Sequence, residues 1–221
     1  MGKEDWYRNT QWNEDIEAAF RLRLNRSRGP FYKSQYLRIQ GWILLSSADA
    51  ACQRVGIALL NELVREYADQ EETLGQRFEA LTELGDYYYE KEAWEEAYVH
   101  YKNAVSIDPR ITISQQHTII GYIKSAVLSK HDADYPDCHE RLLKLEDPLF
   151  PYQSYDLGLA GALLYHAMGW SEAAGIYASI ALKSLGLTSS IIKGGKPFGE
   201  ASASNWELLF LQSIFNPLRQ S

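Results

Sequence analysis

Apolar and small residues recur at helical spacing through residues 78–111, and this pattern constrains the fold more than any other part of the chain. Leu81, Leu84 and Tyr88 lie three and four residues apart, so they share one face of a helix. The full series is Leu81, Leu84, Gly85, Tyr88, Ala97, Tyr101, Ala104 and Pro109. It predicts two antiparallel helices that are joined by a turn within residues 91–94, with the proline ending the second helix.

A single helix pair cannot bury its own apolar face, so further pairs are expected in the same chain. Residues 154–187 repeat the pattern, with Gly161 and Tyr177 in the places of Gly85 and Tyr101. The corresponding residues are Leu157, Gly161, Leu164, Ala173, Tyr177 and Ile180, and Trp170 stands where the first pair has Trp94. This second match indicates a repeated unit rather than an isolated hairpin.

Weaker helix pairs and two terminal helices complete the expected architecture. Their bounds are residues 13–28 (N-terminal capping helix), 34–68 and 112–147 (weaker pairs) and 201–216 (C-terminal capping helix). The first helices of the four pairs contain Gly41, Gly85, Gly121 and Gly161. A helical glycine costs about 1 kcal/mol relative to alanine, so these glycines indicate close helix crossings. We expect an all-α solenoid of stacked antiparallel hairpins, with about ten helices in a single domain over residues 1–221.

The terminal helices carry more detailed expectations. Asn13 is placed to cap the first helix, and Gly29-Pro30 is expected to end it. The side chains expected to face inward are Ile16, Ala19, Phe20 and Leu24 in the first helix and Trp206, Leu209, Phe210 and Ile214 in the last. Residues 191–200 contain three glycines and a proline, which is typical of a loop.

The pattern of residues 78–111 resembles the tetratricopeptide repeat (TPR), with Leu81 in place of the family's tryptophan and Tyr101 in place of its phenylalanine. The opening residues 5–20 (DWYRNTQWNEDIEAAF) and 36–40 (YLRIQ) resemble the start of an uncharacterised family of bacterial TPR-containing proteins. The first resemblance implies a binding scaffold without catalytic activity, and the second brings no activity with it.

Charge and cysteine content narrow the expected partners and location. The 221-residue chain has a net charge of −7, which argues against coating nucleic acid. Residues 66–97 hold eleven acidic side chains against Arg77 and Lys91, either as a solvated face or as a surface that steers a basic partner. Residues 21–38 hold six basic side chains and no acidic one. The two cysteines form no disulfide framework, and residues 206–215 cover about half a membrane span, so a cytoplasmic protein without membrane insertion is expected.

The TPR resemblance also implies which residues would face a ligand. In that family the first helices of successive repeats line a concave surface. The matching positions here are Arg38, Trp42, Glu79, Thr82, Asp86, Tyr89, Glu90, Tyr122, Tyr155, Tyr165 and His166. The lysine and asparagine clamp with which some family members grip a C-terminal carboxylate is absent, since Thr82 and Asp86 stand at its places. An acidic, tyrosine-lined groove for a basic or aromatic segment of another protein is expected, with packing of these rings between helices as the alternative.

Catalytic and cofactor sites are not expected. Residues 131–139 (HDADYPDCH) hold every common type of metal ligand, but their spacing fits no zinc pattern, and a polar loop with Asp137 capping the next helix explains them more simply. We therefore expect no enzyme, no metal and no cofactor. One concrete version of the binding scaffold is an immunity-type protein that neutralises a basic toxin. The alternatives are a self-associating (homo-oligomeric) assembly scaffold and a metal-dependent enzyme that uses residues 131–139.

Overall fold

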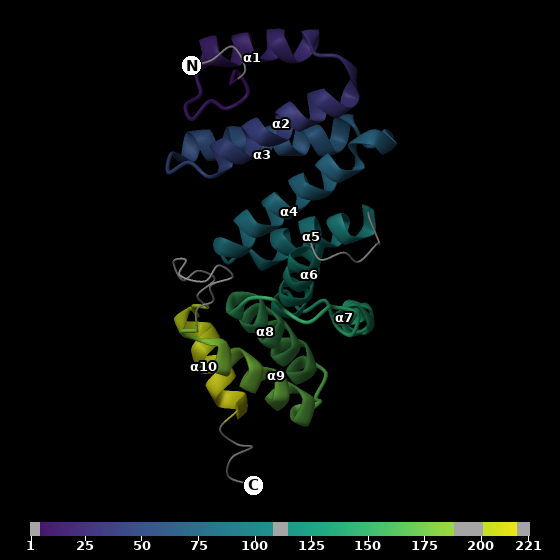
Figure 1. Cartoon of the computed structure of the whole chain (residues 1–221), viewed down its shortest axis with the longest axis vertical. Coiled ribbons are helices and arrows are strands. Elements are labelled where there is room, and N and C mark those ends of the chain that lie inside the picture. Colours follow the sequence, from purple (N-terminus) through teal and green to yellow (C-terminus); the bar gives the residue numbers. More distant parts are fainter. Residues whose placement is uncertain (1–4, 108–114, 188–200, 216–221) are drawn as a thin grey trace. The chain divides into compact units, whose positions relative to one another are not determined.

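The structure is a computed structural model that describes residues 5–107, 115–187 and 201–215 (Figure 1). These residues form ten α-helices and no β-strand, which confirms the all-α fold. The contacts divide the chain into two compact units, Met1–Pro109 and Arg110–Ser221. The single continuous domain stays a prediction.

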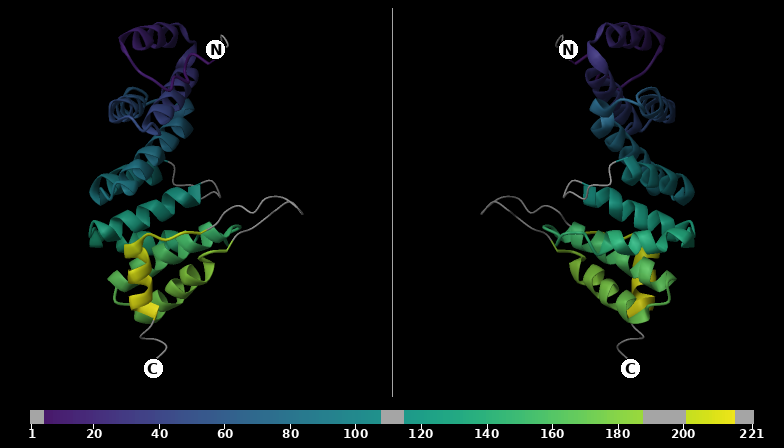
Figure 2. Two further views of the ribbon diagram at one scale, coloured as in Figure 1. Left: turned by 90° about the vertical axis from the view of Figure 1, so that its left-hand side faces the viewer. Right: turned by 90° about the vertical axis from the view of Figure 1, so that its right-hand side faces the viewer.

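Consecutive helices make up both units (Figures 1 and 2). The first unit contains α1 (Glu14–Arg26), α2 (Gly29–Leu45), α3 (Ala50–Glu66), α4 (Leu74–Glu90) and α5 (Trp94–Ile107), with the 3-10 turn η1 (Glu71–Thr73) before α4. The second contains α6 (Gln116–Leu128), the 3-10 turn η3 (Asp132–Asp134), α7 (Tyr135–Leu142), α8 (Pro151–Ala167), α9 (Ser171–Ser184) and α10 (Asn205–Phe215). Within the described residues, none of the helices combines the length and the apolar character that crossing a bilayer requires.

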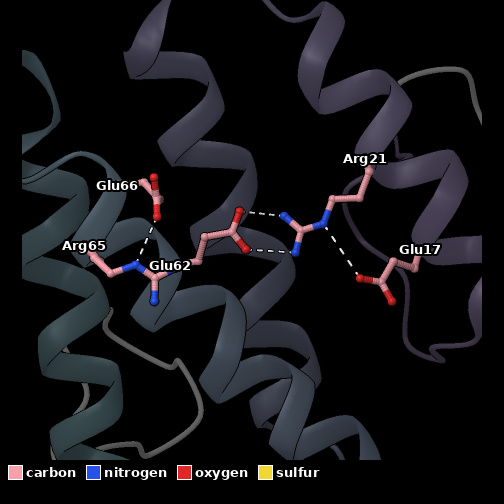
Figure 3. Close-up of polar contacts among 5 residues, drawn as sticks. All are labelled: Glu17, Arg21, Glu62, Arg65 and Glu66. Atoms are coloured by element: carbon pink, nitrogen blue, oxygen red, sulfur yellow. Dashed lines mark hydrogen bonds and ion pairs between the residues drawn. The ribbon is translucent and has the colours of Figure 1, made fainter.

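Helix α1 is held to the first unit by apolar contacts and by one ion pair. Phe20 and Leu24 are buried in the core that α2 and α3 form. The Arg21 guanidinium donates two hydrogen bonds to the Glu62 carboxylate of α3, at 2.6 and 2.8 Å, and its Nε lies 3.8 Å from Glu17 (Figure 3). The bidentate geometry fixes the orientation of α1 as well as its position.

The start of α1 confirms the expected cap, and the helix ends at Arg26, shortly before Gly29-Pro30. The Asn13 side chain accepts a hydrogen bond from the Ile16 backbone N–H at 2.9 Å. Gly29-Pro30 does not lie in a separate loop but begins α2, because a proline in the first turn of a helix gives up an N–H that has no partner there. Ala19, which was expected to face inward, is exposed.

Helices α2 and α3 approach each other at two glycines. A Cβ on Gly56 would lie 2.5 Å from the Leu45 backbone nitrogen and 2.6 Å from the Gly41 carbonyl oxygen. A Cβ on Gly41 would lie 2.8 Å from the Leu60 side chain. As positions on α2 advance from 41 to 45, their partners on α3 move back from 60 to 56, so the two helices run antiparallel. The expected close crossing at Gly41 is confirmed.

The same contacts recur between α4 and α5 and between α8 and α9. A Cβ on Gly85 would lie 2.7 Å from the Tyr101 ring, and a Cβ on Gly161 would lie 2.2 Å from the Tyr177 ring. The predicted tryptophans are also equivalent. Trp94 contacts Tyr89 with ring centroids 4.9 Å apart, and Trp170 stacks on Tyr165 at 5.5 Å. Both units thus have a glycine–tyrosine crossing, while the tyrosine–tryptophan contact is edge-on in the first unit and stacked in the second.

One residue of the second pattern is placed differently from the prediction. Ile180, expected at the buried position of Ala104, is 36% exposed. Ala181 is buried instead and lies against Gly158, whose Cβ would be 2.6 Å from the Ala181 backbone nitrogen. Gly158 adds a second close crossing that the pattern does not mark.

Helices α4, α6 and α8 end with one and the same cap. Glu92, Lys130 and Gly169 have φ angles of 56°, 63° and 77°, in the left-handed region. The next residue in each case donates its N–H back into the helix, namely Ala93 to Tyr88, His131 to Ala126 and Trp170 to Tyr165, at 2.8–3.0 Å. This is the Schellman motif, which usually has glycine at the left-handed residue. Only the third of these helices has that glycine.

The end of the second unit is partly as expected. Trp206, Phe210 and Ile214 of α10 pack on the α8–α9 core, but Leu209 is 68% exposed and Leu211 is fully buried in its place. The helix pair expected over residues 112–147 consists of α6 and the short α7. Pro109, and the loop expected at residues 191–200, lie outside the described residues.

The close crossing at Gly85 yields a stability prediction. Gly85→Ala places a methyl group against the Tyr101 ring, which is 2% exposed and cannot move aside freely because its hydroxyl donates to Asp86. We expect a loss of about 1–3 kcal/mol in the free energy of unfolding, measured by urea denaturation. Gly75→Ala is the matched control in the same helix, since nothing lies within 4 Å of its Cβ position, and it should be neutral or slightly stabilising. Equal effects of the two changes would contradict the close crossing.

The left-handed caps yield a second prediction. Glu92→Gly relieves the cost of a side chain at a φ of 56°, so the free energy of unfolding should rise by about 0.5–1 kcal/mol. Gly169→Ala is the opposite change at the equivalent cap and should lower it by a similar amount. Thermal denaturation followed by circular dichroism measures both, and changes of the same sign in the two variants would contradict this assignment.

Candidate functional site

Four carboxylates follow one face of α4. Glu79, Glu83, Asp86 and Glu90 are spaced by four, three and four residues, so they form a row along the helix, which we call the acidic stripe. Glu79 and Glu90 are exposed, and Glu83 and Asp86 are half-buried. The row brings together three residues that were expected at a ligand-facing surface, and it adds Glu83.

A groove lies between α2 and α4 beside this stripe. It has a volume of about 200 Å³ and is lined by Trp42, Leu45, Ser46, Glu83, Asp86, Tyr87 and Glu90. Trp42 is 51% exposed, so its indole offers an open aromatic surface next to the carboxylates. Tyr87 forms the other aromatic part of the lining, and its hydroxyl donates to Gln53 of α3 at 3.2 Å.

Arg38 of α2 is the cation that faces the stripe. Its Nη1 donates to Glu83 at 2.7 Å, and its Nε donates to Gln76 at 2.9 Å. The Arg38 side chain is 25% exposed and that of Glu83 only 13%. Arg38 therefore joins α2 to α4 through an ion pair with the Glu83 carboxylate.

Glu83 is the most perturbed acid of the stripe. Burial raises the pKa of its carboxyl from 4.5 to about 7, the positive charge of Arg38 opposes the rise, and the charges of Glu79 and Asp86 add to it. Its Oε1 accepts from Arg38, while its Oε2 is buried and has no hydrogen-bond partner among the described residues. Keeping the Glu83 carboxylate ionised in this environment costs free energy, and either protonation or a second nearby cation would reduce that cost.

Two other residues expected at the surface of the first unit point elsewhere. Thr82 is 7% exposed, and its hydroxyl donates to the Phe78 carbonyl within α4. Tyr89 packs against Trp94 at the turn between α4 and α5 and does not line the groove.

The second unit does not offer the expected tyrosine surface. Three tyrosines expected in an open groove are buried, with exposed fractions of 1% for Tyr122, 4% for Tyr155 and 3% for Tyr165. The prediction that they line a groove is therefore wrong. Tyr155 donates to the buried Glu207 of α10, and Tyr165 lies between the rings of Trp170 and Tyr177. These rings fill the space between helices. His166 is exposed and meets Phe210 edge-on, with ring centroids 5.7 Å apart.

Within residues 131–139, Asp132–Asp134 form the 3-10 turn η3 and the residues from Tyr135 onward belong to α7, so the expected loop is largely helical. Asp137 does not cap α7 but lies in its first turn, where it accepts from Arg141 at 2.8 Å. His139 contacts the Tyr165 hydroxyl at 3.1 Å, and burial raises the pKa of the Cys138 thiol to about 12. Within the part of the chain that the structure describes, no group of three or more His, Cys, Asp or Glu side chains could hold a metal ion.

Sequence reasoning missed Glu83 and Tyr87. The spacing of the four acids along the chain contains the signal for Glu83, because the i, i+4, i+7, i+11 pattern that reveals an apolar face reveals a charged one equally well. Nothing in the spacing indicates that Glu83 is the buried member, since this depends on the neighbouring helix α2.

Comparisons with known proteins give no relative. The chain matches no family model, no curated protein and no solved structure.

The raised pKa of Glu83 predicts how stability depends on pH. The folded state holds the Glu83 proton more tightly than the unfolded state, so this stabilising contribution is complete below the usual pKa of 4.5 and is lost as pH rises through about 7. In Glu83→Gln, which cannot ionise, the loss should be absent. The free energy of unfolding of the variant relative to the wild type should therefore increase by up to about 3 kcal/mol between pH 4.5 and pH 8.

Urea denaturation across this pH range measures the effect. Glu90→Gln removes a carboxylate from the same stripe at an exposed position and is the matched control, whose pH dependence should follow the wild type. Parallel curves for the wild type and Glu83→Gln would show that Glu83 titrates normally.

Proposed function

We propose that this chain is a non-catalytic, TPR-like scaffold that binds a basic segment of another protein at the acidic stripe and Trp42. The observation that carries this proposal is the row Glu79–Glu83–Asp86–Glu90 beside an open groove, with Arg38 as its facing cation. A segment rich in lysine or arginine would neutralise the remaining negative charge, and long cationic side chains can lie over the exposed indole ring.

The recurrent packing supports a helical-repeat assignment. The Gly85–Tyr101 and Gly161–Tyr177 contacts, and the matching Tyr–Trp contacts at the two turns, come from residues at the same separation in the chain. In TPR proteins, the first helix of each hairpin carries the ligand-facing residues. The groove between α2 and α4 lies between two such first helices, which is why we assign binding to this face.

The chemistry of the groove refines the expected partner. The aromatic contribution comes from Trp42 and Tyr87 rather than from a row of tyrosines. Selectivity therefore depends mainly on carboxylates, and a basic segment fits better than an aromatic one. Neutralising a basic toxin in the manner of an immunity protein is one function of this kind. A cytoplasmic location is part of the proposal, supported by the free and buried Cys52 and Cys138.

Binding of a basic peptide tests the proposal directly. A fluorescein-labelled decapeptide of alternating arginine and glycine should bind the wild-type chain, with an affinity that falls several-fold when salt is raised from low to high concentration. The double change Glu79→Gln/Glu90→Gln removes two exposed charges from the stripe and should weaken binding by about tenfold, as measured by fluorescence anisotropy.

Two controls separate a specific site from general acidity. Glu71→Gln/Glu72→Gln removes the same charge at exposed positions of η1, outside the stripe, and should leave the affinity within about twofold of wild type. Trp42→Ala keeps every charge and should weaken binding several-fold. Equal loss in both double variants would reduce the effect to net charge, and binding that is insensitive to salt would contradict charge-driven recognition.

A further inference from the structure

The second unit contains a small, partly open cavity that the proposed binding surface does not use. It has a volume of about 140 Å³ and lies between α6, the segment that follows α7, and α8. Its apolar lining comes from Ile120, Leu145, Pro148 and Leu157. An engineered apolar cavity of about 150 Å³ holds one benzene molecule, so this space suits a single ring.

Gln116 gives the cavity a polar side with an unmet hydrogen bond. Gln116 belongs to the lining, and its side-chain Nε2 is buried without a hydrogen-bond partner among the described residues. Leaving a buried amide N–H without an acceptor costs about 1–3 kcal/mol. A ligand atom that accepts this hydrogen bond would recover that cost.

Among the other polar side chains of the lining, Asp156 and Gln153 are hydrogen-bonded, whereas His117, Glu146 and Tyr152 are exposed. Asp156 accepts from Lys124 at 2.9 Å, which balances its charge. The Gln153 carbonyl oxygen accepts from the backbone N–H groups of Leu149 and Phe150, at 2.9 and 3.1 Å. Glu146 is exposed and makes no ion pair within the described residues. Its negative charge disfavours an anionic ligand.

We propose that this cavity binds a small uncharged molecule that carries one ring and a carboxamide-type group. The ring occupies the apolar space between Ile120, Leu145 and Leu157, and the carbonyl oxygen of the ligand accepts from Gln116 Nε2. A primary amide suits the site in addition because its NH₂ group can donate toward the Glu146 carboxylate. Carboxylic acids of the same shape are excluded by charge.

Titration of the full chain with benzamide, followed by two-dimensional ¹H–¹⁵N NMR, tests this assignment. Benzamide should shift signals of α6 and α8 residues in a saturable manner, and benzoate, which has the same size but carries a negative charge, should bind at least about tenfold more weakly. Gln116→Met keeps the side-chain length without the amide and should weaken benzamide binding by about five- to tenfold. Leu157→Trp fills the cavity and should abolish binding.

The result is independent of the acidic stripe, because the basic decapeptide should bind equally well to Gln116→Met and to the wild type. A normal helical circular dichroism spectrum and a cooperative thermal unfolding transition show that each variant is folded. The assignment is overturned if benzamide causes no saturable shift, if benzoate binds as tightly as benzamide, or if Gln116→Met binds benzamide like the wild type.

Discussion

Three helix pairs of this chain, α2–α3, α4–α5 and α8–α9, bury their apolar faces by crossing closely at glycines, which carry no side chain. At Gly56 and Gly158 a Cβ atom would stand within 2.6 Å of backbone atoms of the opposite helix, which no side chain can approach. Backbones that touch in this way cannot slide along each other without a clash, so each glycine fixes the register of its pair. Helix α4 packs against both members of the α2–α3 pair, and the groove beside the acidic stripe lies between α2 and α4.

The fold could be predicted from the sequence because it depends on local periodicity and on these glycines. The spacing of Leu81, Leu84 and Tyr88 is enough to place α4, and Gly41, Gly85 and Gly161 mark real crossings. The structure differs from the prediction where contacts with a neighbouring helix determine which side chain is buried. Leu209 and Leu211 both fit the apolar pattern of α10, and only the position of the α8–α9 core selects Leu211 for burial. The left-handed conformation of Glu92 could not be predicted from the sequence either, because the usual signal for this cap is a glycine and the chain has glutamate there.

The candidate site was predictable in its charges but not in its aromatic part. The repeat pattern correctly indicated that three acidic residues share one face of α4, namely Glu79, Asp86 and Glu90. Acidic side chains are rarely fully buried, so their place near the surface could be expected. Tyrosine is different because it packs as well between helices as at an interface. Tyr155 and Tyr165 are buried because Glu207 and Trp170 meet them from other helices, and these contacts depend on tertiary structure.

Glu83 takes part both in the contact between α2 and α4, through Arg38, and in the lining of the groove. In the proposed complex, a cation bound in the groove would therefore affect how α2 packs on α4. Arg38 satisfies one oxygen of this carboxylate and leaves the other buried and unbonded, which keeps the pKa near 7. A basic side chain that entered beside Trp42 would stabilise the ionised form, so binding near neutral pH would release a proton. The bound side chain would also compete with Arg38 for the Glu83 carboxylate. Arg38 donates its other hydrogen bond to Gln76, which belongs to α4 like Glu83. A cation bound at Glu83 would therefore weaken the Arg38–Glu83 ion pair, which is a contact that holds α2 against α4.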